Sequence, residues 1–122
     1  MICFSPNFSN GEIENVLEAF KMVELLVVHD NFRSELVEMA HVVLPSATFA
    51  EKDGTYTNME RRVQLLHQAL KPKNGEMPEW EIFGLLAQRM GYAGLQYQVS
   101  SEVMDEIAGL TPIYAGVSHQ RL

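Results

Sequence analysis

Cysteine is nearly absent from this sequence, since Cys3 is the only one among its 122 residues. A single cysteine excludes a disulfide within the chain and any metal site that needs several cysteines. The histidines are scattered and lack the close pairing of structural zinc sites; they are His29, His41, His67 and His119. We therefore expect no metal site built by this chain, and a reducing, cytoplasmic setting.

Long hydrophobic runs and positive charge are also scarce. The longest apolar run, residues 25–28, is far shorter than the roughly 20 residues that a membrane-spanning helix needs. No secretory signal is visible at the N-terminus. The 16 acidic residues outnumber the 9 basic ones and give a net charge of −7, which argues against binding to a nucleic-acid backbone. We expect no membrane partner and no nucleic-acid partner, although a small nucleotide needs only one or two local cations.

Catalytic motifs are missing as well. No serine lies in a Gly-x-Ser-x-Gly elbow, and neither the Gly-x-Gly-x-x-Gly nor the phosphate-binding Gly-x-x-x-x-Gly-Lys-Ser/Thr pattern occurs. Cys3 lies in an apolar run, which predicts a buried and inert thiol. We expect no catalytic residue in this chain.

The first 45 residues alternate between strand and helix patterns. Short apolar runs predict strands over residues 1–4, 24–29 and 41–44, and apolar spacing of three and four predicts helices over 12–22 and 33–40. This order is typical of a parallel, right-handed α/β unit. The continuous apolar run of the second strand predicts helices on both faces of the sheet. We expect one domain over residues 1–122, of α/β class, with a Rossmann-like open sheet that is mainly parallel and has flanking helices.

The pattern changes after Pro45. Asp53-Gly54 predicts a tight turn in which Gly54 can take a positive φ. Residues 63–69 fit a strand or a helix, and residues 71–78 fit a loop. Apolar spacing predicts a helix over 79–91 that ends at Gly91. Residues 93–122 are expected to form a last helix, capped by Ser100 or Ser101, and an irregular tail.

Two charged residues are candidates for ligand contacts. Asp30 ends the second strand, where ligands sit in open α/β sheets, and its carboxylate could accept the ring N–H and the exocyclic amine of guanine. It could equally be the N-cap of a helix over 31–40, and both readings stay open. Lys52, beside the predicted turn, suits a phosphate or a ring oxygen, although lone turn lysines are usually solvated. We expect Asp30 and Lys52 to face one pocket.

For two other features, a purely structural role is favoured over ligand binding. Arg61 and Arg62 beside Glu60 fit a surface ion-pair cluster better than an anion site. Trp80, on the apolar face of the predicted helix, fits a core residue better than a stacking platform.

A longer motif resembles a known family. Residues 43–64, VLPSATFAEKDGTYTNMERRVQ, resemble the "VVLP…EKDGTxTNxERRxQ" stretch of molybdopterin oxidoreductases. The segments LLVVHD at 25–30, PEWEI at 78–82 and RMGY at 89–92 are similar to the same family. The tail at 110–118 is similar to formate dehydrogenase catalytic subunits in particular.

This resemblance implies a role in cofactor binding. In that family, the equivalent domain binds one guanine dinucleotide arm of bis(molybdopterin guanine dinucleotide). By position in the motifs, His29 and Asp30 meet the guanosine end, and Lys52 contacts the dinucleotide or the pterin. Glu79 stands at a cofactor-binding aspartate, and Ser5 replaces the asparagine after the first strand.

The family's iron–sulfur cysteines and metal ligand have no counterpart in these residues. The resemblance therefore implies an internal part of a formate dehydrogenase-like catalytic subunit that is inactive alone. Its partner is the rest of that subunit, on the same or a separate chain. Apolar surface left uncovered predicts homo-oligomers. A structural or assembly module, related to the large iron–sulfur subunit of respiratory NADH dehydrogenase, is the alternative.

Overall fold

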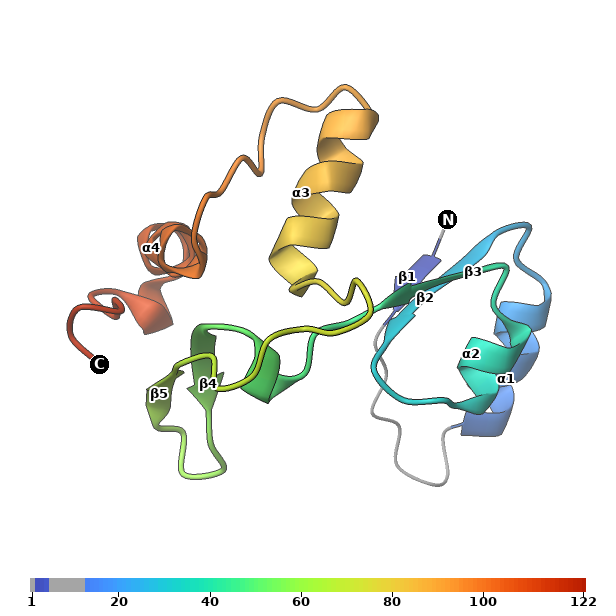
Figure 1. The fold of residues 1–122 in the computed structure, drawn as a ribbon, viewed down its shortest axis with the longest axis horizontal. Coiled ribbons are helices and arrows are strands. Elements are labelled where there is room, and N and C mark those ends of the chain that lie inside the picture. Colours follow the sequence, from blue (N-terminus) through green and yellow to red (C-terminus); the bar gives the residue numbers. More distant parts are fainter. Residues whose placement is uncertain (1, 5–12) are drawn as a thin grey trace. The chain divides into compact units, whose positions relative to one another are not determined.

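The computed structural model describes the backbone of residues 2–4 and 13–122, and the side chains from Val16 onward. The chain divides into two compact units, Met1–Ser46 and Ala47–Leu122, which are taken one at a time (Figure 1). The boundary follows Pro45 by one residue, where the sequence pattern changes. The prediction of one domain over the whole chain stays a prediction.

The first unit contains a parallel sheet in the order β1-β2-β3. The strands are β1 (Ile2–Phe4), β2 (Leu26–Asp30) and β3 (Val42–Pro45). Helix α1 (Ile13–Lys21) and helix α2 (Glu35–Met39) alternate with them along the chain (Figure 1). The α/β class and all five elements predicted for residues 1–45 are confirmed, with ends shifted by one or two residues. A larger, Rossmann-like open sheet stays a prediction.

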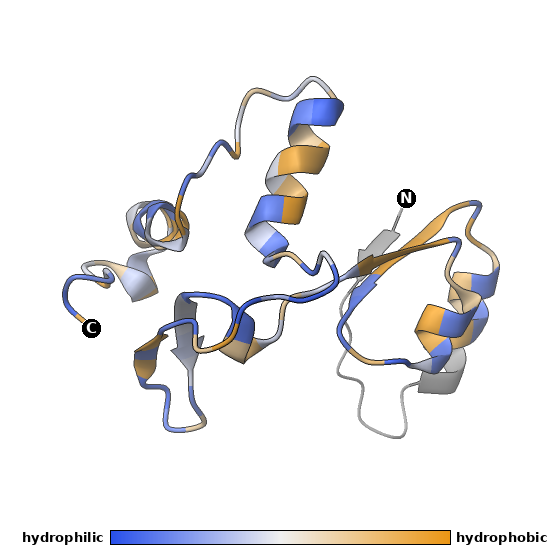
Figure 2. Ribbon diagram, in the orientation of Figure 1, coloured by the Kyte–Doolittle hydropathy of each residue, from blue (hydrophilic) through white to orange (hydrophobic). Residues whose placement is uncertain are grey.

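Both described helices of this unit cover the same face of the sheet. Leu26 and Val28 alternate along β2, so their side chains point to one face, and they form a buried cluster with Phe20 of α1 and Leu36 of α2. Figure 2 shows apolar residues of this unit along β2 and β3 and on the coloured parts of the two helices. The expectation that helices cover both faces is therefore wrong for α1 and α2, because both pack against the face of Leu26 and Val28.

The second unit begins with a short 3-10 helix and an antiparallel hairpin. Helix η1 (Phe49–Glu51) precedes β4 (Gly54–Thr57), which pairs with β5 (Val63–Leu66). The ambiguous segment 63–69 therefore begins as a strand. The predicted tight turn at Asp53-Gly54 is wrong, because Gly54 is paired with Leu66 and does not adopt a positive φ.

The hairpin turn lies instead at residues 58–62. The N–H of Asn58 donates to the carbonyl of Arg62 at 3.0 Å, and the side-chain oxygen of Asn58 accepts the N–H of Arg62 at 2.9 Å. Arg61 takes the positive φ of 63° that closes this turn. Arg62 lies 3.9 Å from Glu60 with both side chains exposed, so the predicted surface ion pair is confirmed.

Helix α3 (Glu79–Arg89) ends as predicted. Gly91 has a φ of 79°, its N–H donates to Gln88 at 3.0 Å, and the N–H of Tyr92 donates to Ala87 at 2.9 Å. This pair of bonds is a Schellman motif, which satisfies carbonyl groups at the end of the helix. Gly84, within α3, lies so close to the 92–99 segment that an added Cβ would approach the carbonyl oxygen of Leu95 to 2.9 Å.

Helix α4 (Ser100–Leu110) and the 3-10 helix η2 (Pro112–Tyr114) complete the second unit. The predicted serine cap is wrong, because Val99 is the N-cap and its side chain cannot accept a hydrogen bond. The carboxylate of Glu102 accepts the N–H of Gln98 at 2.6 Å instead. Within residues 13–122, no helix is long and apolar enough to cross a membrane.

Candidate functional site

Asp30, the last residue of β2, has a carboxylate that orders the following turn. Its Oδ1 accepts the N–H of Asn31 at 2.7 Å and of Phe32 at 3.1 Å, and its Oδ2 accepts the hydroxyl of Ser34 at 3.5 Å. The N-cap of α2 is Ser34, whose hydroxyl accepts the N–H of Val37 at 3.3 Å. The reading of Asp30 as the helix N-cap is therefore wrong. Its carboxylate stabilises the turn and remains at the carboxyl end of a parallel strand.

The other predicted residues of this unit differ in their surroundings. His29 pairs with Leu44 in the sheet register and is 2% exposed. Its side chain is thus buried, not open at the surface like that of Asp30. Ser5 lies outside the described residues. Contacts of Ser5, His29 and Asp30 with a guanosine stay predictions.

Lys52 and Glu79, 27 positions apart, form an ion pair in the second unit. The Nζ of Lys52 lies 2.5 Å from each carboxylate oxygen of Glu79, and the side chains are 14% and 38% exposed. Glu79 is the first residue of α3, where a helix dipole favours negative charge. The reading of Lys52 as a solvated turn lysine is wrong, because its ammonium is mostly buried and paired.

The acidic neighbours of Lys52 in the sequence are held by other groups. Glu51 accepts the N–H and the hydroxyl of Thr48 at 3.0 and 2.9 Å, closing the first turn of η1. Asp53 accepts the N–H of Gln68 at 3.0 Å and lies 3.3 Å from the ring of His67. Lys52 differs from Glu51 and Asp53 in that it bonds to a residue of α3.

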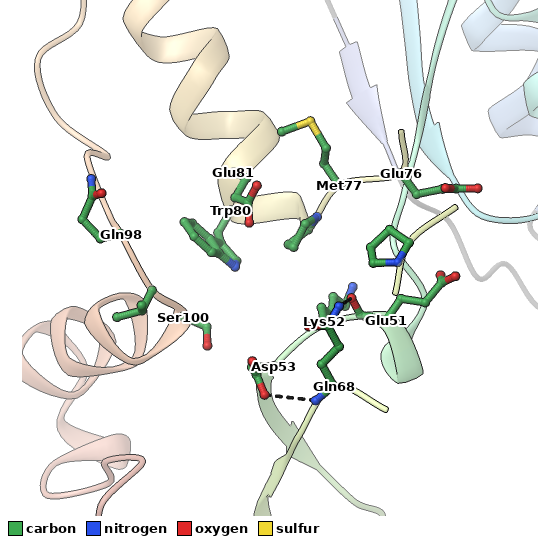
Figure 3. Close-up of a pocket in the computed structure, with 13 residues that line it drawn as sticks. Glu51, Lys52, Asp53, Gln68, Glu76, Met77, Trp80, Glu81, Gln98 and Ser100 are labelled. Atoms are coloured by element: carbon green, nitrogen blue, oxygen red, sulfur yellow. Dashed lines mark hydrogen bonds between the residues drawn. The ribbon is translucent and has the colours of Figure 1, made fainter. Parts of the chain in front are cut away.

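Two hollows of the second unit adjoin Lys52. The larger, of about 340 Å³, is shown in Figure 3, where the indole of Trp80 lies across from Lys52 and Asp53. The smaller, of about 280 Å³, is lined by β4, α4 and the ion pair of Lys52 with Glu79. Trp80 lines both hollows, so its interpretation as a core residue missed a role in shaping them. Its place beside Glu79 in the sequence is the one signal that could have indicated this.

The larger hollow has an acidic wall. Its lining includes the carboxylates of Glu51, Asp53, Glu76 and Glu81, whereas Lys52 is the only cationic residue that lines it in the part of the chain that the structure describes. Glu76 accepts the N–H of Lys73 at 3.0 Å and is also bonded to the N–H of Asn74. The backbone hydrogen bonds from Asn74 contribute most to lowering the pKa of Glu76. At neutral pH this wall repels anions, and the ammonium of Lys52 can offset only part of that repulsion while it is paired with Glu79 or after its release.

Tyr56 adds a group that titrates at high pH. Burial, and then the negative charge of Glu79, raise the pKa of the Tyr56 phenol. We expect this phenol to ionise above the usual value of about 10. The neutral form is favoured by the fold, so its contribution to stability is present below pH of about 10 and is lost as the pH rises through the higher folded value. In a titration of tyrosinate absorbance, Tyr56→Phe should remove one late-ionising phenol; loss of a phenol that ionises at the usual pH would contradict this.

No protein-built metal site is found in the part of the chain that the structure describes, where no three His, Cys, Asp or Glu side chains cluster. His41 has a structural role, since its Nδ1 accepts the N–H of Leu26 at 3.0 Å. The side chain of Cys3 lies outside the described residues.

Comparison with known proteins gives relatives and a family model that agree with one another. A Staphylococcus haemolyticus protein named "Putative formate dehydrogenase" is 50% identical over 113 residues, which cover 93% of this chain and 11% of that protein. Two Staphylococcus aureus proteins of the same name, from strains bovine RF122 and USA300, are 48% and 47% identical over the same shares. The chain thus spans about 11% of the length of these curated relatives. The family model described as molybdopterin oxidoreductase matches residues 1–89. With most of its length matched by that model, this chain belongs to the molybdopterin oxidoreductase family.

Proposed function

We propose that this chain binds the guanine dinucleotide arm of bis(molybdopterin guanine dinucleotide) in a formate dehydrogenase-like oxidoreductase, and that it is inactive alone. The observation that carries the proposal is the carboxylate of Asp30, which is held by the turn at the carboxyl end of β2. Ligands of open α/β sheets bind at this end of the strands.

The hydrogen-bonding capacity of Asp30 fits guanine. An ionised carboxylate offers about four lone-pair positions, of which Oδ1 uses two for N–H groups and Oδ2 uses one for a long contact with Ser34. The ring N–H and exocyclic amine of guanine donate side by side, one to each oxygen, so Oδ1 must release one of its two turn N–H groups when guanine binds. Adenine offers no such pair of donors. We assign His29 and Ser5 to the same end of the ligand, as the family motif implies.

We also assign Lys52 and Glu79 to cofactor binding, as the family motif implies. Lys52 offers an ammonium for a phosphate, and Glu79 offers a carboxylate for N–H groups of the pterin. When bound, the cofactor supplies the molybdenum or tungsten at which formate is oxidised to carbon dioxide. The residues of this chain bind and orient that cofactor.

Calorimetric titration of the chain with GDP and with ADP tests this proposal. A bidentate pair with the base contributes about 1–3 kcal/mol of discrimination, so GDP should bind roughly tenfold more tightly or better. Equal binding, or none at millimolar concentration, would favour the structural or assembly module. A formate-to-dye assay on the chain supplied with cofactor should show no turnover, and any turnover would contradict the inactivity.

We also propose that the chain self-associates through apolar side chains of α3. Phe83 and Leu85 of α3 are 42% and 48% exposed and Met90, its C-cap, is 72% exposed, and exposed apolar surface marks interaction sites where it is contiguous. Sedimentation velocity should give a sedimentation coefficient that rises with protein concentration. A constant monomer value over the whole range would exclude it.

A further inference from the structure

The ammonium of Lys52 is held in a way that suits an oxyanion. Both oxygens of Glu79 lie 2.5 Å from its Nζ. A phosphate group would also place two of its oxygens against a single ammonium. The Lys52 side chain is 14% exposed, so its charge is only weakly screened by water.

The surroundings give this pairing a consequence for ligands. Among the described residues, Lys52 is the only cationic one that lines either hollow, and Glu79 neutralises it. The larger hollow is otherwise lined by carboxylates at four positions. A diphosphate entering this region therefore meets net negative charge, and it can pair with Lys52 only when the ion pair of Lys52 and Glu79 opens.

We infer that Glu79 occupies, as an internal carboxylate, the position at Lys52 that a diphosphate-type oxyanion takes, and so competes with it. The inference rests on the proposed function only in assigning that oxyanion to the dinucleotide. Binding of the oxyanion displaces the carboxylate of Glu79 from Nζ. The freed carboxylate can then accept hydrogen bonds from other N–H groups of the ligand.

The test uses the full chain and inorganic pyrophosphate as the probe. Glu79→Gln removes the competing charge, so pyrophosphate should bind about tenfold more tightly than to the unaltered chain, as expected for one charge-assisted bond no longer contested. Glu81→Gln is the matched control, because it changes the net charge equally in the same helical turn and lines the larger hollow. It has no ion pair with Lys52 among those of the described residues, so the affinity should change by less than about threefold. Glu79→Ala gives a second measurement if Glu79→Gln does not fold.

The results of these titrations distinguish competition by Glu79 from a general effect of charge. Adding Lys52→Met to Glu79→Gln should abolish the gain in pyrophosphate affinity. Equal gains in Glu79→Gln and Glu81→Gln would show a general charge effect and overturn the inference, as would weaker binding by Glu79→Gln. The preference for GDP over ADP tests the proposed function separately: its absence would remove the guanine assignment and leave the pyrophosphate result unaffected.

Discussion

Replacement of Asp30 by asparagine is expected to abolish the preference of this chain for guanine. Asparagine can still accept the N–H groups of Asn31 and Phe32 through its oxygen, so the turn should persist. Its amide nitrogen, however, meets the donors of guanine with further donors. Loss of one hydrogen bond to a charged group costs about 1.5–3 kcal/mol, so the dissociation constant for GDP should rise by roughly tenfold to a hundredfold.

The measurement compares GDP with IDP, which lacks the exocyclic amine. The unaltered chain should prefer GDP, whereas Asp30→Asn should bind both nucleotides alike. Ser34→Ala is the control, because it removes the cap of α2 and the contact to Oδ2 but leaves the carboxylate. A preference for GDP that survives in Asp30→Asn would contradict the assignment of Asp30.

Opposite effects on stability are expected from alanine at two helical glycines. Gly84→Ala places a Cβ at 2.9 Å from the carbonyl oxygen of Leu95, and a backbone atom cannot yield as a flexible side chain would. Overpacking of this kind costs about 1–3 kcal/mol, which exceeds the gain of about 1 kcal/mol from replacing glycine within a helix. We expect the free energy of unfolding to fall by up to about 2 kcal/mol.

Gly109 in α4 is the matched control, because a Cβ there meets no atom within 4 Å. Gly109→Ala should leave stability unchanged or raise it by up to about 1 kcal/mol. Urea unfolding followed by the fluorescence of Trp80, the single tryptophan, reports on α3. Equal effects of the two substitutions would show that the approach of Leu95 to α3 does not constrain Gly84.

Local patterns were sufficient to predict the elements and the parallel sheet of residues 1–45 but not the pairing of β4 with β5. The alternation in residues 1–45 and the end of α3 at Gly91 depend on neighbours in sequence, and both are confirmed. Gly54 was misread because Asp-Gly favours turns locally, whereas here its backbone pairs with Leu66. Register between distant residues depends on tertiary contacts that turn propensities do not encode.

For the candidate site residues, too, the sequence indicated the positions and the structure was needed for the contacts. The position of Asp30 at the end of β2 follows from the strand pattern, and only its contacts with the turn required the structure. Lys52 was identified from its place beside the predicted turn and again from the family motif, whereas Glu79 was identified from the motif alone. Nothing in their spacing of 27 residues indicated that they bond to one another, because such a contact depends on how η1 and α3 pack.

The binding of guanine at the end of β2 can be tested most directly by NMR titration with GDP, with ADP as the control. The amide N–H groups of Asn31 and Phe32 donate to Asp30, so they report on any new partner of its carboxylate. Binding of GDP at Asp30 should shift both amide resonances, and equal additions of ADP should move them far less. Unchanged Asn31 and Phe32 resonances at saturating GDP, or equal shifts with ADP, would contradict guanine binding at Asp30.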